Sequence, residues 1–155
     1  MREDAWNEGA ERDMISGLHP ILLYDGVCGL CNRSVQFILR HDKAAAFRFA
    51  SLQSSFAARV LARHGANPSD LDTVYLLTNF EQPGESLLAR SEAVLFVLGR
   101  LGGFWRIVAL LFRCIPRAVD DWAYRRVAHN RYRIFGRYET CPLPTEDTRA
   151  RFLDV

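Results

Sequence analysis

The feature of this sequence with the clearest chemical potential is a pair of cysteines, Cys28 and Cys31, separated by two residues. The pair lies in the stretch YDGVCGLCNRS, residues 24–34. Cysteines at this spacing are found as a redox couple, as half of a metal site, or as two packed core residues. The elements that position the pair decide between these three interpretations.

The pair stands between a predicted strand and a predicted helix. Residues 20–25, PILLYD, form an apolar run that ends in an Asp-Gly turn signal, as a buried strand does. From Cys28 to about His41 the apolar residues recur at helical spacing. The unpaired N–H groups and positive dipole end of a helix stabilise a thiolate and lower a cysteine pKa from its usual value of about 8.5. The sequence therefore predicts Cys28 as an exposed nucleophile and Cys31, one turn inside, as the resolving thiol.

Three neighbours of the cysteines are further candidates for this site. Asp25, at the strand end, has two interpretations: its carboxylate accepts backbone N–H groups in the turn, or it accepts the proton of Cys31. Gly26 and Gly29 allow close backbone approach or a positive φ, and both equally suit an ordinary turn.

Zinc binding is the main alternative to redox chemistry. Structural zinc usually needs four ligands, commonly as two pairs, and Cys114, Cys141 and His129 supply candidates without paired spacing. Cys114 lies in an apolar segment, where a free cysteine is expected to be a small core residue. Cys141, before a proline, is expected to be a packed structural cysteine or a third exchanging thiol. The other histidines, at positions expected for helix ends or the surface, are His19, His41 and His64.

Composition indicates one globular domain. The chain has 155 residues, of which 49% are hydrophobic and 25% charged, with a net charge of +2 that requires no acidic partner. Four cysteines are too few for a fold stapled by disulfides, and the opening MREDAWNEGAERDM is polar rather than apolar. We expect a cytoplasmic protein with a polar extension over residues 1–17 and a single domain over 18–155. We expect no cofactor beyond an external protein or small-molecule disulfide or dithiol partner.

The remaining patterns predict the order strand, helix, strand, helix, strand, strand, then helices. Ser91 is expected to cap the helix after the last strand, with the carboxylate of Glu92 in its first turn. The predicted segments after the first helix are a strand over 46–51, a helix over 54–64, a strand over 71–78, a turn over 81–85 and an antiparallel strand over 86–90.

An apolar segment over residues 93–115 is long enough to cross a bilayer, but three arginines interrupt it. A central arginine costs about 2.5–3.5 kcal/mol on an insertion scale that is lenient to charge. The sequence instead predicts two helices joined near Gly102 and Gly103, with contact to a membrane surface left open as an alternative.

The last part of the chain is predicted to be helical up to about Tyr132. Its arginines alternate with aromatic residues, a mixture that suits nucleic acid. Asp120 and Asp121 offset part of that charge, so we expect a solvated helix face and no nucleic-acid partner.

The stretch DGVCGLC, residues 25–31, resembles the Asp-x-x-Cys-x-x-Cys signature of the DCC family of predicted thiol-disulfide oxidoreductases. The resemblance runs from about residue 20 to the end. It implies thiol-disulfide exchange without a named substrate, and a thioredoxin-like fold. This is a three-layer α/β sandwich with a mixed four-stranded sheet, extended by C-terminal helices. The later blocks that carry it are RSEAVLFVLGRLGGFW (90–105), IPRAVDDWAY (115–124), NRYRIFG (130–136) and CPLP (141–144).

The resemblance also implies that Asp121, Tyr124, Asn130 and Arg131 form a shared structural or site element. We expect their helix to pack beside the dithiol and to order it through an Asp–Arg pair.

One departure from thioredoxin concerns the residue that faces the dithiol. Thioredoxins place a cis-proline directly before the third strand, whereas Pro68 lies several residues too early here. Ser91 is the candidate to face Cys28 instead. A non-catalytic module that binds zinc or a partner through the same two cysteines is the alternative function.

Overall fold

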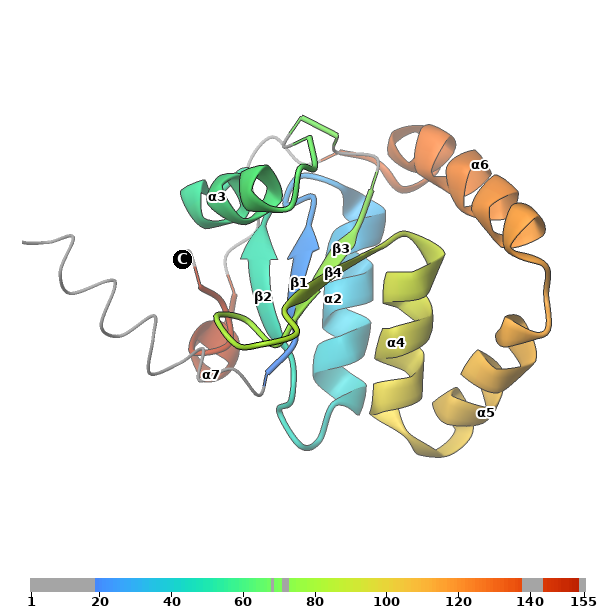
Figure 1. Ribbon diagram of the computed structural model, residues 1–155, viewed down its shortest axis with the longest axis horizontal. Coiled ribbons are helices and arrows are strands. Elements are labelled where there is room, and N and C mark those ends of the chain that lie inside the picture. Colours follow the sequence, from blue (N-terminus) through green and yellow to red (C-terminus); the bar gives the residue numbers. More distant parts are fainter. Residues whose placement is uncertain (1–18, 68, 71–72, 138–143, 154–155) are drawn as a thin grey trace, which may run out of the picture.

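The computed structural model describes residues 19–67, 69–70, 73–137 and 144–153. The polar extension predicted for residues 1–17, Pro68 and Cys141 lie outside the described residues. The elements, labelled as in Figure 1, are β1 (Ile21–Tyr24), α2 (Gly29–His41), β2 (Arg48–Ser51), α3 (Ser55–Arg63), β3 (Tyr75–Thr78), β4 (Ser86–Ala89), α4 (Ser91–Leu101), α5 (Gly103–Arg113), α6 (Arg117–Phe135) and α7 (Glu146–Arg149).

The four strands form one mixed sheet in the order β2-β1-β3-β4. β1 pairs with β2 in parallel, with Ile21 opposite Arg48, and with β3 antiparallel, with Ile21 opposite Leu77. β4 returns antiparallel to β3, as the sequence predicted. Because parallel neighbours need a crossover connection, α2 carries the chain from the end of β1 back to the start of β2. The start of α2 consequently lies at the end of the central strand β1.

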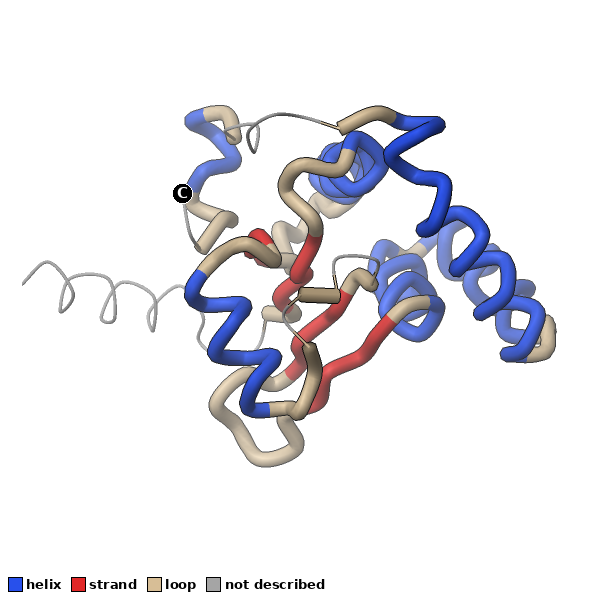
Figure 2. Tube along the Cα trace, turned by 90° about the horizontal axis from the view of Figure 1, so that it is seen from above, coloured by secondary structure: helices blue, strands red, loops and turns tan. Residues whose placement is uncertain are grey.

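The sheet separates two apolar cores, because successive side chains of a strand point to opposite faces. Ile21 and Leu23 pack toward α3, whereas Leu22 and Tyr24 pack toward α2 and α4. Figures 1 and 2 show α3 on one side of the sheet and α2 and α4 on the other. This three-layer α/β arrangement with added C-terminal helices is the thioredoxin-like fold expected from the resemblance.

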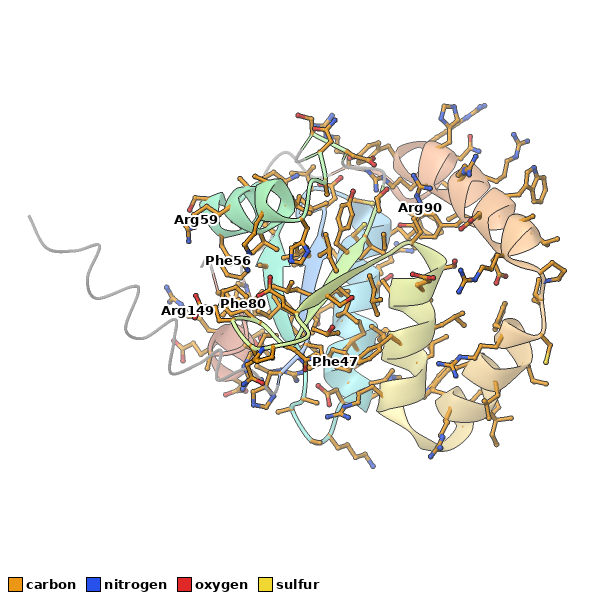
Figure 3. The ribbon with its side chains drawn as sticks, in the orientation of Figure 1. Phe47, Phe56, Arg59, Phe80, Arg90 and Arg149 are labelled. Carbon is orange, nitrogen blue, oxygen red and sulfur yellow. The ribbon has the colours of Figure 1, made fainter. Side chains whose placement is uncertain are left out.

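The core on the α3 side is mainly aliphatic and includes one close aromatic pair. Phe56 of α3 and Phe80, which follows β3, lie near one another in Figure 3, with ring centroids 5.5 Å apart. Aromatic pairs at such distances stabilise by about 0.5–1.5 kcal/mol beyond the area they bury. This pair therefore packs α3 against the segment that follows β3.

Ser91 is the first residue of α4 and not its cap, so that prediction is wrong. The cap position belongs to Arg90, which has a φ of 55° and offers no side-chain hydrogen bond to the helix. The Arg90 N–H donates to the carbonyl of Val74 at 3.0 Å, which turns the chain one residue earlier than expected. The Ser91 hydroxyl instead donates to Asp121 Oδ1 at 3.4 Å and links α4 to α6.

α4 and α5 meet at Gly102 and Gly103, where the sequence predicted the junction of two helices. Gly102 and Gly103 have φ values of 75° and 53°, in the left-handed region that a side chain disfavours. Within the described residues no helix is long and apolar enough to cross a membrane. α5 buries Ala109 but exposes Phe104, Ile107 and other large apolar side chains. Contact of this face with a membrane surface, which the sequence left open as an alternative, is not tested by this finding.

Candidate active site

Cys28 and Cys31 lie at the start of α2, where the sequence placed them. Cys28 is the N-cap residue in an extended conformation, with φ −81° and ψ 124°, and its Sγ accepts a hydrogen bond from the Cys31 N–H at 3.5 Å. Both cysteines are free thiols. The Cys28 sulfur thus takes the place that a serine or aspartate oxygen usually holds at a helix start.

Cys28 is fully buried, with 0% of its surface exposed, whereas Cys31 is partly exposed. The prediction of an exposed Cys28 is therefore wrong. The residues that follow α6 lie against it: the Gly29 N–H donates to the Gly136 carbonyl at 3.2 Å, and Cys28 forms an isolated antiparallel bridge with Arg137. We call Gly136 and Arg137 the cover segment.

Gly29 makes this close approach sterically feasible. A Cβ at Gly29 would lie 2.2 Å from the carbonyl oxygen of Phe135, which is far inside contact distance. Of the two roles expected for this glycine, the structure shows the close approach. Its φ is not positive, unlike that of Gly136 at 79°.

Replacing Gly29 with alanine should therefore uncover Cys28 while leaving the fold intact. The last residue of α6 and the cover segment that follows it must shift, because the added methyl meets the backbone of Phe135 and Gly136 and not a flexible side chain. A tenfold change in the equilibrium between covered and uncovered Cys28 corresponds to about 1.4 kcal/mol. Loss of the hydrogen bond from Gly29 to the cover segment supplies about 0.5–1.5 kcal/mol of this, and the steric conflict adds to it. We expect iodoacetamide to alkylate Cys28 at least about tenfold faster, measured by mass spectrometry of the cysteine-containing peptides.

Gly99→Ala is the matched control for this substitution. Gly99 lies inside α4, and a Cβ there meets nothing within 4 Å. Alanine should leave Cys28 alkylation unchanged and stabilise the helix by up to about 1 kcal/mol. Equal alkylation of Cys28 in both variants and the parent would show that the cover segment does not limit access.

The two thiols share one proton unequally. Cys28 accepts a hydrogen bond from the Cys31 thiol, which lowers the pKa of Cys28 to about 6 against the opposing effect of burial. The Cys31 N–H and the positive charge of Arg131 act in the same direction. That hydrogen bond, burial and the negative charge of Cys28 raise the pKa of Cys31. At neutral pH the pair therefore holds one thiolate, at Cys28, and one thiol.

Asp25 is 1% exposed, and both of its carboxylate oxygens are hydrogen bonded. Oδ1 accepts from the Val27 N–H at 3.1 Å and from Gln53 Nε2 at 2.7 Å. Oδ2 accepts from Arg131 Nη2 at 3.3 Å and from the Tyr132 hydroxyl. Asp25 therefore has the expected turn role and also joins the turn to α6. Proton transfer from Cys31 to this carboxylate stays a prediction.

Three polar residues of the site were missed by the sequence analysis. Gln53 bridges Asp25 and the Gly26 N–H, which donates to Gln53 Oε1 at 3.1 Å. Asn32 Nδ2 donates to the carbonyls of Gly26 and Cys28 at 2.8 and 2.9 Å. Together with Tyr132 on Asp25, these side chains fix the backbone of the turn before Cys28. Asn32 lies one helical turn after Cys28, and this spacing could have marked it as a site residue. No feature of the sequence near Gln53 indicates its role.

Two of the four α6 residues singled out by the resemblance lie at the site. Arg131 is 3% exposed and pairs with Asp25. The Tyr124 hydroxyl accepts from the Val74 N–H at 2.9 Å, and burial raises the pKa of Tyr124 to about 12. The structure thus places α6 against α2 and shows an Asp–Arg pair, formed by Asp25 and Arg131, whereas the ordering of the dithiol by this helix stays a prediction.

The other two residues make contacts away from the cysteines. Asp121 accepts from Ser91, and Asn130 Nδ2 donates to the Arg126 carbonyl one turn earlier at 2.8 Å. Ser91, proposed to face Cys28, is therefore engaged with Asp121. No cis peptide bond occurs among the described residues.

A cavity of about 400 Å³ opens between α2, α4 and α6, and Cys31 forms part of its wall. Cys28 is not among the described residues that line it. Arg33, Tyr124 and Arg131 also line the cavity, as do the aliphatic and aromatic side chains Phe37, Ile38, Val94, Leu98 and Val127.

The described part of the chain offers no further ligands that would complete a zinc site with Cys28 and Cys31. No group of three or more His, Cys, Asp or Glu side chains that could hold a metal occurs there. Cys114 is exposed rather than packed in a core, because it caps the end of α5, where its Sγ donates to the Leu110 carbonyl at 3.6 Å. The prediction of a core position for Cys114 is therefore wrong.

Comparison with known proteins gives the class of this protein. Residues 22–137 match the DCC1-like thiol-disulfide oxidoreductases, and the chain belongs to this family. A chloroplastic DCC family protein of Arabidopsis thaliana is 38% identical over 124 residues, covering 80% of this chain and 69% of that protein. The uncharacterized protein YuxK of Bacillus subtilis is 37% identical over 133 residues, covering 86% of this chain and 93% of that protein. No solved structure matches the chain.

Proposed function

We propose that this protein catalyses thiol-disulfide exchange, with Cys28 as the nucleophile and Cys31 as the resolving thiol. The observation that carries the proposal is the unequal pair at the helix start. Cys28 has a pKa of about 6, and the pKa of Cys31 is raised. A thiolate attacks disulfides and a thiol does not, so attack by Cys28 is favoured at neutral pH.

The exchange proceeds in two steps that balance. The Cys28 thiolate attacks one sulfur of a substrate disulfide, forms a mixed disulfide and expels the other sulfur as a thiolate, which takes up a proton. Cys31 then loses its proton and attacks the Cys28 sulfur, which releases the second substrate thiol. Two electrons pass from the cysteine pair to the substrate. Because Cys28 is already a thiolate, one of the two protons comes from Cys31 and the other from solvent, and the reverse reaction oxidises a dithiol partner.

Access to Cys28 is part of this mechanism. Because Cys28 is buried beneath the cover segment, a substrate reaches its sulfur only when that segment moves aside. The contacts of the segment with the start of α2 are a hydrogen bond to Gly29 and the bridge at Cys28, and further contacts with Tyr132 tie the segment to α6. A protein or small-molecule disulfide partner would therefore compete with the protein's own chain for this position.

A redox titration tests the proposal directly. We expect a reversible two-electron transition confined to Cys28 and Cys31 in a series of glutathione buffers, read by alkylation and mass spectrometry. Cys114, exposed on α5, serves as the internal control and should stay alkylatable throughout or form only glutathione adducts. The absence of an internal disulfide, with zinc bound in protein purified without added metal, would contradict the proposal and favour the zinc-binding alternative.

A further inference from the structure

The cavity beside Cys31 has the size and lining of a small-molecule site. Its volume of about 400 Å³ lies in the range of about 300–1,000 Å³ that such sites occupy. Apolar side chains from three helices face it, including Phe37 of α2, Leu98 of α4 and Val127 of α6. In Figure 1, α2 and α4 lie on the same side of the sheet, and α6 contacts both of them. A molecule that binds in this cavity would therefore leave water and contact apolar side chains along most of its length.

The cavity adjoins the cysteine pair, so a molecule bound there could react with it. Cys31 forms part of its wall, and the Cys28 sulfur lies 3.5 Å from the Cys31 nitrogen. A disulfide bond at this wall therefore lies beside Cys31, and it reaches the buried Cys28 sulfur when the cover segment moves aside. The apolar arm of the same molecule would fill the space between the three helices.

The charged residues that line the cavity indicate which polar group a bound molecule should carry. The described residues that line the cavity include two arginines, Arg33 and Arg131, and no aspartate or glutamate. Asp25 balances the charge of Arg131. Arg33 is exposed, lies 5.9 Å from the centroid of the Phe135 ring, and makes no ion pair within the described parts of the chain. A carboxylate on the occupant would find its counter-charge at Arg33.

We propose that this cavity is the substrate site and takes a small-molecule disulfide with an aliphatic arm that ends in a carboxylate. This inference rests on the proposed function. The arm lies among Phe37, Leu98 and Val127, the carboxylate faces Arg33, and the disulfide faces the dithiol. The two-step exchange then yields the Cys28–Cys31 disulfide and two molecules of the substrate thiol.

A homologous series of disulfides measures the contribution of the arm. The reduced protein is mixed with dithiodiacetate, dithiodipropionate, dithiodibutyrate and dithiodihexanoate, and each rate constant is divided by that of dithiothreitol with the same compound. These compounds share the dialkyl disulfide and the carboxylates and differ in methylene number. We expect the ratio to rise by up to about fourfold for each methylene that the cavity buries. A ratio that is flat or falls along the series overturns the inference.

Val127→Ser and Val119→Ser form a matched pair of variants. Both valines lie on α6 with similar exposure, 47% and 51%, but only Val127 lines the cavity among the described residues. Because neither side chain is buried, both variants should fold. Val127→Ser should flatten the dependence on arm length, and Val119→Ser should leave it unchanged. Equal behaviour of the two variants overturns the inference.

Arg33→Gln tests the recognition of the carboxylate. This variant should slow the dicarboxylates by up to about fivefold, the effect of an exposed ion pair, and leave the corresponding diamides unchanged. Arg40→Gln, on the same helix but not lining this cavity in the described chain, is the control. An equal effect on acids and amides overturns the charged part of the inference. No exchange with any disulfide, glutathione disulfide included, would instead overturn the proposed function.

Discussion

Replacing Cys28 with serine should reduce thiol-disulfide exchange to the uncatalysed background, whereas replacing Cys31 with serine should trap the protein as a mixed disulfide. The serine hydroxyl does not ionise near neutral pH, so the first variant has lost the thiolate at the N-cap of α2. The second variant retains the Cys28 sulfur but has no thiol to release the substrate. Mass spectrometry of the intact protein after mixing with glutathione disulfide distinguishes the two outcomes. Stable glutathione adducts should occur at Cys28 in Cys31→Ser alone.

Cys114→Ser supplies the control, because it removes an exposed thiol that lies outside the pair. Its turnover should equal that of the parent protein. Retained turnover in Cys28→Ser would contradict the assignment of the nucleophile. A stable adduct on Cys31 in that variant would show that the partly exposed thiol attacks first.

The pH dependence of the first step follows from the lowered pKa of Cys28. The thiolate is present above a pH of about 6 and is lost as the pH falls through that value. The rate of adduct formation in Cys31→Ser should therefore rise through a pH near 6 and then level off. In Cys31→Ala the side chain that donates to Cys28 is gone, so the midpoint should move up toward the ordinary cysteine value of about 8.5.

The strands, the first two helices and the position of the cysteine pair could be predicted because each depends on a local pattern. Apolar residues in β1 and helical spacing after Cys28 are read within a dozen positions, and the structure places β1 at Ile21–Tyr24 and α2 at Gly29–His41. The exposure of the cysteines could not be predicted in this way. The cover segment that buries Cys28 follows α6, far along the chain, and only the fold brings it to Gly29.

The partners of Asp25 show the same limit. Arg131 is 106 residues from Asp25 in sequence, and only the resemblance to a family singled it out. Gln53, 28 residues away, belongs to a loop with no pattern that marks it. Cys114 was misplaced for a different reason: an apolar segment such as α5 does not show which of its sides will face the protein. Only Ala109 of this helix is buried.

Replacing Arg131 with methionine should destabilise the protein and change the chemistry of Cys28 together. Arg131 and Asp25 form a buried ion pair, and removing one member of such a pair costs about 3–5 kcal/mol because the other charge stays buried. Asp25 keeps its bonds from Val27, Gln53 and Tyr132, so we expect a loss near the lower end of that range. Urea unfolding of the reduced protein measures the free energy of unfolding.

A merely structural role for Arg131 would leave the titration of Cys28 unchanged. Its positive charge contributes to the low pKa of Cys28, so Arg131→Met should raise the midpoint of adduct formation above 6. Less stabilisation of the thiolate also disfavours the reduced pair, so the reduction potential should become more negative. Arg133→Met, an exposed position on the same helix, should change neither quantity.

A double-mutant cycle isolates the ion pair from the other contacts of Arg131. Asp25→Asn keeps the size of the side chain and removes its charge, so Arg131→Met should cost less stability in that background than alone. The difference between the two costs is the coupling energy, which should be about 0.5–3 kcal/mol for residues in one network. A coupling near zero would mean that the ion pair with Asp25 contributes no net stability, and that Arg131 stabilises the site through its other contacts, such as the hydrogen bond to the Tyr132 hydroxyl. The effect of the Arg131 charge on Cys28 is measured separately, by the midpoint of adduct formation in Arg131→Met.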